Sequence, residues 1–327
     1  MTLKINTRTI LQYIVPPVIT GGLCIFLYRD IEWSDVINGL RSTNWLFISA
    51  FLICNVFAML ARARRWQIQL HTMGVNPPFG DMARSIFGTY AVNLIFPRLG
   101  EVWRCSYIAG NSGSGFSRIF GSMVADRLVD TLCIFLLSLL SFILAAPAMS
   151  RFVAESTLIE RSTMIASSPW VVFSLFLLFI LCILCIYAPW SPFVRVRRFI
   201  TNMWNGFMTL FSIRQGRVTW VLLTVAIWLC YGLGMYLSMI AYPPTADIVN
   251  QHGLICVLIT FVFGSLAMAI PSNGGIGPWQ ASVLLSLSGI YGMESTQVLT
   301  FATINLAFST LLCIALGLYT FVTIQKT

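Results

Sequence analysis

Two stretches rich in proline and glycine interrupt apolar segments of this chain: Asn93-Leu-Ile-Phe-Pro-Arg-Leu-Gly-Glu101 in the first half and Pro271-Ser-Asn-Gly-Gly-Ile-Gly-Pro-Trp-Gln280 in the second. Proline breaks a continuing helix, and glycine tolerates sharp turns. The apolar segments around these stretches, residues 84–97 and 253–291, therefore do not fit simple membrane spans. We expect two re-entrant helical hairpins instead, at about residues 84–110 and 253–291.

The rest of the chain is strongly apolar. Of its 327 residues, 57% are hydrophobic and 9% are charged, and the mean hydropathy is +0.83. A soluble domain carries roughly 25% charged residues, so the composition predicts one integral membrane domain over residues 1–327. The fold class that we expect is an all-α polytopic membrane protein with about six full spans and the two hairpins. The runs long enough to cross a hydrocarbon core of about 30 Å are residues 10–28, 45–61, 128–146, 170–188, 220–241 and 298–322.

The distribution of basic residues predicts the orientation, because Lys and Arg concentrate in cytoplasmic loops. If both termini are cytoplasmic and each hairpin returns to its own side, the inner segments hold 16 of the 20 basic residues. The two hairpins then enter from opposite faces of a cell (inner) membrane, which suggests a possible inverted repeat. No residue-level repeat is evident from the sequence. The longest polar segment, a loop at 189–219, is too small to fold alone.

Several function classes are disfavoured. Eight of the nine cysteines lie in apolar runs, so we expect no disulfides, and the two histidines are isolated. No zinc-ligand spacing or catalytic motif is visible, so we expect no metal, no cofactor and no enzymatic activity. The basic residues flank the apolar runs instead of forming one patch, which argues against nucleic-acid binding.

The charges at the first interruption are the most informative. An arginine deep in a bilayer costs roughly 2.5–3.5 kcal/mol and usually faces a partner or a polar cavity. The guanidinium of Arg98 suits phosphate binding. Pro97 ends a helix and Gly100 allows close approach, so free backbone N–H groups could join Arg98 around an anion. Glu101 could orient Arg98 or carry a proton; alternatively, Arg98 and Glu101 form a structural pair at the cytoplasmic interface.

A second charged group opens the span at 128–146. Asp126 and Asp130, on either side of Arg127, are four residues apart and on one helix face, so the two carboxylates could hold an arginine beneath a cavity. The alternative is a helix cap with a structural pair. The cluster Arg62, Arg64, Arg65 and Trp66 is interpreted as a membrane anchor that could attract anionic headgroups.

The second interruption offers further donors. Asn273, Gly274 and Gly275 would leave backbone N–H groups open at the tip of the hairpin, where a headgroup could bind. The alternative is a plain loop on the non-cytoplasmic side.

These motifs together resemble the lysylphosphatidylglycerol synthase transmembrane-region family, a flippase-like family. The resemblance is carried by Ala-Arg-Ala-Arg-Arg-Trp at 61–66, by Asn93–Arg104, by Asp-Arg-x-x-Asp at 126–130 and by Gly-Gly-Ile-Gly before Trp279, and it covers residues 45–322. It implies a lipid translocase with two opposed re-entrant elements around a central cavity. The headgroup contacts that it implies are Asn93, Arg98 and Glu101, supported by Asp126, Arg127 and Asp130.

The chain departs from the family pattern at two positions. Asp126 stands where family members often have glutamate, and Gln280 stands where they often have another glutamate, which puts coupling to protons or cations in doubt. A stand-alone member without the soluble aminoacyl-transfer domain is expected, and hence no aminoacyl transfer.

The expected function is therefore transbilayer movement of a phosphate-bearing membrane lipid, with a possible homo-oligomer or a lipid-modifying partner enzyme. The alternatives are an intramembrane enzyme acting on a lipid-linked substrate, and a lipid-binding accessory subunit of a glycosyltransferase or lipid-modifying enzyme. The candidate substrate-binding residues are Asn93, Pro97, Arg98, Gly100, Glu101, Asp126, Arg127, Asp130, Asn273, Gly274, Gly275 and Gln280.

Overall fold

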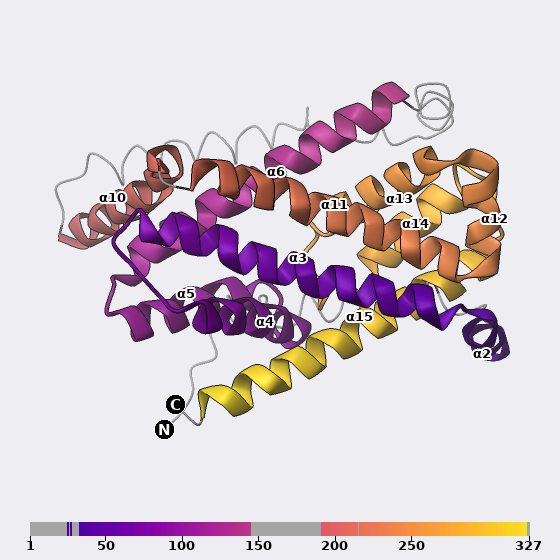
Figure 1. The fold of residues 1–327 in the computed structure, drawn as a ribbon, viewed down its shortest axis with the longest axis horizontal. Coiled ribbons are helices and arrows are strands. Elements are labelled where there is room, and N and C mark those ends of the chain that lie inside the picture. Colours follow the sequence, from indigo (N-terminus) through magenta and orange to yellow (C-terminus); the bar gives the residue numbers. More distant parts are fainter. Residues whose placement is uncertain (1–24, 26, 28–32, 145–190, 215, 326–327) are drawn as a thin grey trace.

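The computed structural model describes residues 25, 27, 33–144, 191–214 and 216–325, and this part of the chain is built from helices (Figure 1). The expected spans at 10–28 and 170–188 lie wholly or almost wholly outside the described residues. The helices are α2 (Trp33–Ser42), α3 (Trp45–His71), α4 (Phe79–Ile95), α5 (Leu99–Ser112), α6 (Phe116–Leu144), α10 (Ser191–Ser212), α11 (Arg217–Ala241), α12 (Pro243–His252), α13 (Leu254–Ala267), α14 (Pro278–Leu287) and α15 (Ser295–Ile324).

Four of the described helices are long and apolar enough to cross a membrane, namely α3, α6, α11 and α15. They coincide with the other four expected spans. Helices α12 and α13 qualify together, but they are bent by 117° at the break between them. The all-helical, multi-pass membrane class is thus confirmed. Helices suit this environment because they satisfy their own backbone groups where no water is available.

Both interruptions fall between short helices, as the proline and glycine content predicts. Helix α4 ends before Pro97, and α5 begins directly after Arg98, which adopts a left-handed backbone with φ of 67°. Between α13 and α14, Gly274, Gly275 and Gly277 all have positive φ, a region that glycine enters without steric cost. The chain therefore forms two helical hairpins, α4–α5 and α13–α14.

The two halves of the molecule pack in a reciprocal pattern. Helices α3 and α11 run antiparallel along each other at the centre (Figure 1). Helix α4 of the first hairpin packs on α15, whereas α13 of the second hairpin packs on α6. In the same way, α5 packs on α6 and α14 packs on α15. Each hairpin is thus held between a long helix of its own half and one of the other half, as in an inverted repeat.

This packing identifies a residue-level repeat that the sequence analysis did not find. A Cβ on Gly88 would lie 2.2 Å from the ring of Trp103, and a Cβ on Gly264 would lie 2.7 Å from the ring nitrogen of Trp279. Each tryptophan follows its glycine by fifteen residues, and the second pair lies 176 positions after the first. The signal was missed because it consists of two widely spaced contacts instead of a run of identities.

The expectation of a polar loop at 189–219 was wrong, since most of it forms α10. This helix packs along α6 through two glycines. A Cβ on Gly121 would lie 2.0 Å from the carbonyl oxygen of Met203, and one on Gly206 would lie 2.1 Å from that of Arg118. Small residues allow helix backbones to approach closely. The arginines in this segment interrupt its apolar residues, so that it lacked the continuous apolar run expected of a span.

Candidate functional site

The tips of the two hairpins contact each other. The backbone N–H of Gly274 donates to the carbonyl oxygen of Asn93 at 3.1 Å, and the Arg98 guanidinium donates to the carbonyl oxygen of Ala269 at 2.6 Å. The two bonds are reciprocal, because Gly274 lies 176 positions after Arg98 and Ala269 lies 176 positions after Asn93. The interrupted segments, far apart in sequence, therefore form one junction.

Further contacts at this junction use groups that the sequence analysis expected to be free. The side chain of Asn273 donates to the carbonyl oxygens of Leu94 and Ile95, at 3.2 and 3.1 Å. The N–H of Gly100 donates to the Asn93 side chain at 2.8 Å. Most of these groups thus join the hairpins instead of surrounding an anion.

The close approach expected at Gly100 is confirmed, since a Cβ there would lie 2.2 Å from the carbonyl oxygen of Thr89. Arg98 has the same left-handed backbone as its counterpart Gly274, with φ of 67° and 61°. A side chain in this conformation costs about 1–2 kcal/mol. The local strain at Arg98 is therefore maintained by the surrounding contacts, among them the bond from its guanidinium to the second hairpin.

Glu101 pairs with Arg127, so the alternative in which it forms a structural pair with Arg98 was wrong. The carboxylate lies 2.6 Å from the Arg127 guanidinium and accepts a weaker bond from the Asn93 side chain at 3.3 Å. Both partners are partly accessible, with exposed side-chain fractions of 17% for Glu101 and 38% for Arg127. This pair is the accessible edge of a larger charged cluster.

The buried part of the cluster lies between α3 and α6. Asp130 pairs with Arg62 at 2.5 Å and with Arg65 at 2.8 Å, and Asp126 pairs with Arg65 at 2.6 Å. The two aspartates thus face one arginine, as their spacing predicts. The anchor interpretation was wrong for Arg62, Arg65 and Trp66, because all three are buried. Arg64 is exposed.

Arg104 completes the cluster and is not among the candidate site residues predicted from the sequence. Its side chain is fully buried, and its Cζ lies 4.7 Å from the centre of the Trp66 ring. The nearest carboxylate within the described residues is that of Asp126, whose Oδ2 lies 4.0 Å from Nη2 of Arg104. Among the described residues, none accepts a hydrogen bond from its Nε, Nη1 or Nη2. The signal that could have found it is its position three residues after Glu101, on the same face of α5.

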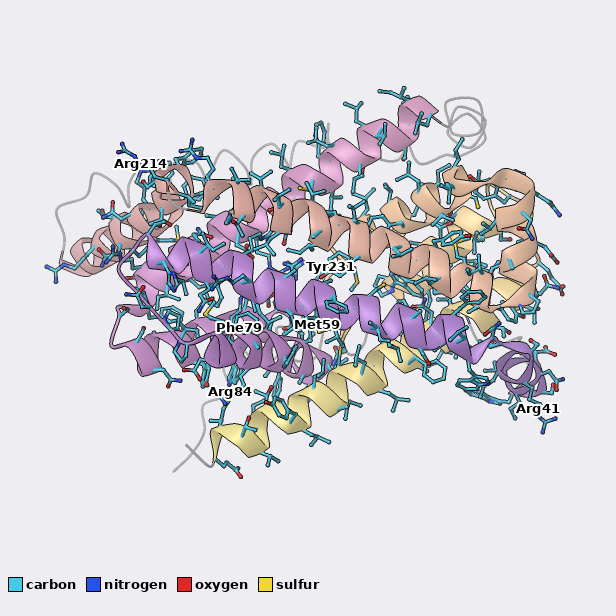
Figure 2. The ribbon with its side chains drawn as sticks, in the orientation of Figure 1. Arg41, Met59, Phe79, Arg84, Arg214 and Tyr231 are labelled. Atoms are coloured by element: carbon cyan, nitrogen blue, oxygen red, sulfur yellow. The ribbon has the colours of Figure 1, made fainter. Side chains whose placement is uncertain are left out.

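The cluster reaches the middle of the spanning helices. Arg62 contacts the hydroxyl of Tyr231 at 3.5 Å, and Tyr231 lies midway along α11 (Figure 2). Ten residues separate it from Ala241, which is about 15 Å of helix. That is half of a hydrocarbon core of about 30 Å. Charged groups at this depth are costly and mark functional sites by default.

The remaining candidate residues shape the second hairpin. Gln280 is buried, and its Oε1 accepts a hydrogen bond from the N–H of Gly277 at 3.0 Å, which caps α14. Gly275 lies in the turn, where a Cβ would meet the sulfur of Met268 at 2.7 Å. These two residues have a structural role in the state described here, and a role in binding stays a prediction for them.

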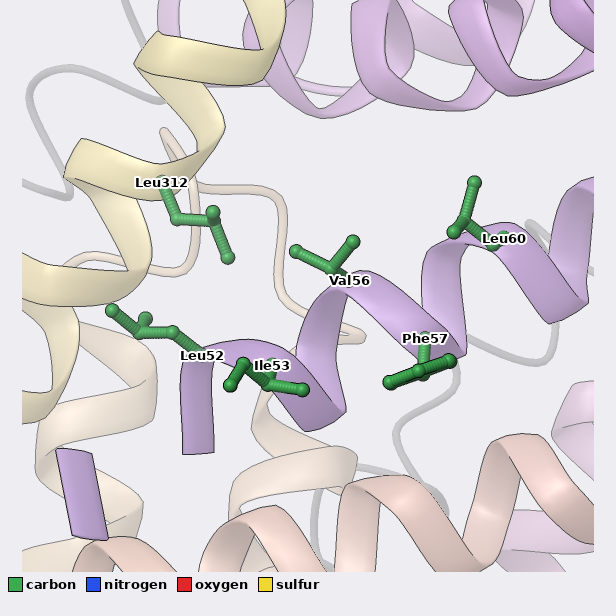
Figure 3. Close-up of a pocket in the computed structure, with 6 residues that line it drawn as sticks. All are labelled: Leu52, Ile53, Val56, Phe57, Leu60 and Leu312. Atoms are coloured by element: carbon green, nitrogen blue, oxygen red, sulfur yellow. The ribbon is translucent and has the colours of Figure 1, made fainter. Parts of the chain in front are cut away.

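Two shallow grooves lie on apolar surfaces. One, of about 300 Å³, is lined by Leu52, Ile53, Val56, Phe57 and Leu60 of α3 and by Leu312 of α15 (Figure 3). The other, of about 400 Å³, lies between α14 and α15 and includes Gln280 and Thr303. Such linings suit hydrocarbon chains and not a charged group. No cluster of metal-binding side chains occurs among residues that the structure describes.

Comparisons with known proteins place this architecture in a family. None of the curated proteins matches the chain. A family model described as the lysylphosphatidylglycerol synthase TM region matches residues 13–317, which is most of the chain. The chain is therefore a multi-pass membrane protein that belongs to the lysylphosphatidylglycerol synthase TM region family.

Proposed function

We propose that this protein is a transbilayer lipid translocase, which binds the phosphate-bearing headgroup of a membrane lipid beside the junction of the two hairpins. The observation that carries the proposal is the charged cluster, whose arginines outnumber its carboxylates four to three. It comprises Arg62, Arg65, Arg104 and Arg127 with Glu101, Asp126 and Asp130. A positive surplus in an apolar surrounding attracts an anion.

The arrangement of the hairpins supports movement in addition to binding. In transporters, interrupted helices from two halves of a chain meet at the substrate site, where their free backbone ends line a polar cavity. Here the junction consists of four direct hydrogen bonds between the tips. Separating the tips would open a polar path between the halves, while the lipid tails stay in the bilayer or in the apolar grooves.

The headgroup would first meet the accessible pair at the edge of the cluster. Arg127 is paired with the carboxylate of Glu101 through one contact, whereas a phosphate can accept two hydrogen bonds from a guanidinium and carries more charge. The headgroup would thus replace Glu101 at Arg127. We place the protein in a cell membrane with both termini cytoplasmic, as the basic residues predict.

A lipid-transfer assay tests the proposal. The wild type and Arg127→Gln are reconstituted in liposomes that contain fluorescent phosphatidylglycerol, and dithionite bleaches the label in the outer leaflet. We expect the wild type to expose the inner-leaflet label and Arg127→Gln to lose most of this activity. Arg118→Gln removes an exposed arginine of α6, the helix that also carries Arg127, and should act as the wild type does.

Wild-type bleaching at the rate of empty liposomes would overturn the proposal. Lipid binding without transfer would favour the accessory-subunit alternative, and a chemically changed lipid would favour the intramembrane enzyme.

A further inference from the structure

The charged cluster has one more arginine than it has carboxylates. Arg62 and Arg65 are paired with Asp130 and Asp126, and Arg127 is paired with Glu101. The remaining arginine is Arg104, which is fully buried. Its distance of 4.0 Å to Asp126 is an electrostatic contact without a hydrogen bond. The net positive charge of the cluster therefore resides on a side chain whose donors have no acceptor among the described residues.

The corresponding position of the second hairpin holds an uncharged residue. The counterpart of Arg104 in the second half, 176 positions later, is Gln280, which is also buried. Gln280 is neutral and caps its own hairpin through Gly277. An unsatisfied buried guanidinium destabilises a folded protein. A buried charge whose donors are unsatisfied in the unliganded protein, at a position where the other half of the repeat has a neutral residue, points to a ligand that satisfies it.

Glu101, at the partly accessible edge of the cluster, is the carboxylate nearest to Arg104 along α5. It precedes Arg104 by three residues on α5, and its carboxylate interacts electrostatically with both Arg127 and Arg104. Asp126 lies 2.6 Å from Arg65 and 4.0 Å from Arg104, so its single negative charge is shared between two arginines. An anion that replaced the Glu101 carboxylate at Arg127 would come within reach of the free donors of Arg104.

We propose that Arg104 is a phosphate-binding residue, engaged when an anion displaces the Glu101 carboxylate from Arg127. The ligand is a phosphate group, either of a lipid headgroup or free in solution. The inference rests on the proposed function only if the phosphate belongs to a lipid headgroup. Arg104 and Arg127 would then hold the phosphate from two helices, α5 and α6.

A binding experiment tests this assignment on the purified full chain in mild detergent. The probes are dioctanoyl phosphatidylglycerol and inorganic phosphate, with dioctanoylglycerol as the neutral control, and the dissociation constant is measured by isothermal titration calorimetry. We expect Arg104→Gln to weaken binding about ten- to a hundredfold, since a bidentate charge-assisted contact is lost. The dissociation constant of Arg104→Lys should lie between those of the wild type and Arg104→Gln, because lysine keeps the positive charge but lacks the planar guanidinium. Arg118→Gln, at an exposed arginine of α6, should bind as the wild type does.

Two further variants separate binding from a structural role. If Arg104 only balances the charge of Asp126, the double variant Arg104→Gln with Asp126→Asn should bind as the wild type does, which would overturn the inference; we expect it to stay weak. Glu101→Gln removes the competing carboxylate and should bind the probes more tightly. Size-exclusion profiles establish that each variant is folded.

The possible results distinguish this inference from the proposed function. Binding of both probes shows recognition of the phosphate itself, and binding of the lipid alone shows recognition of a headgroup; both support the inference if Arg104→Gln is impaired. Equal binding by Arg104→Gln, or no binding by the wild type, overturns it. A wild type that binds phosphate but transfers no lipid refutes the proposed function and leaves the inference standing.

Discussion

Replacing Asp130 with asparagine should destabilise the protein by a predictable amount. Asp130 is buried and accepts from Arg62 at 2.5 Å and from Arg65 at 2.8 Å. Removing one partner of a buried ion pair costs about 3–5 kcal/mol. Arg65 keeps its pair with Asp126, so that only Arg62 loses its carboxylate, with Tyr231 at 3.5 Å as its remaining partner. We therefore expect Asp130→Asn to lower the free energy of unfolding by about 3 kcal/mol, the lower end of this range.

The free energy of unfolding is measured by reversible denaturation in mixed detergent micelles. A loss of about 3 kcal/mol shifts the ratio of folded to unfolded protein by about a hundredfold. The double variant Arg62→Gln with Asp130→Asn removes both charges and should regain about 2 kcal/mol of this loss. A single variant within about 0.5 kcal/mol of the wild type, or a double variant whose loss equals the sum of the two single losses, would refute the reasoning.

Two further variants test the hairpins in the same denaturation assay. Gly88→Ala should lower the free energy of unfolding by about 1–3 kcal/mol, because its Cβ would overlap the Trp103 ring. Gly232→Ala is the control, since a Cβ there meets no neighbouring atom, and it should cause no loss. Equal losses in the two variants would contradict the packing. At Arg98 both variants lose the bond to Ala269, but Arg98→Ala should be less stable than Arg98→Gly by about 1 kcal/mol, since only glycine tolerates the left-handed backbone. Equal stability would disprove the strain.

Local features of the sequence predicted the membrane class and the two hairpins. Whether a segment is long and apolar, or contains a helix-breaking residue, can be decided within the segment itself. The pair Asp126 and Asp130 was likewise predicted to face one arginine, because their spacing fixes a common helix face. The segment at 189–219 escaped this reasoning, since the contacts that stabilise α10 come from α6.

Which charges pair with which was decided by the tertiary structure alone. Glu101 is three positions from Arg98 but pairs with Arg127, because α5 packs on α6, and Arg98 reaches the second hairpin instead. Arg62 and Arg65 follow a predicted span at 45–61 and look interfacial in the sequence, yet α6 and α11 bury them. Ion pairs depend on distances between helices that are far apart in the chain, which the spacing of residues along one helix does not determine. The sequence by itself determined where the helices lie and where they break, and only their packing determined the charged site.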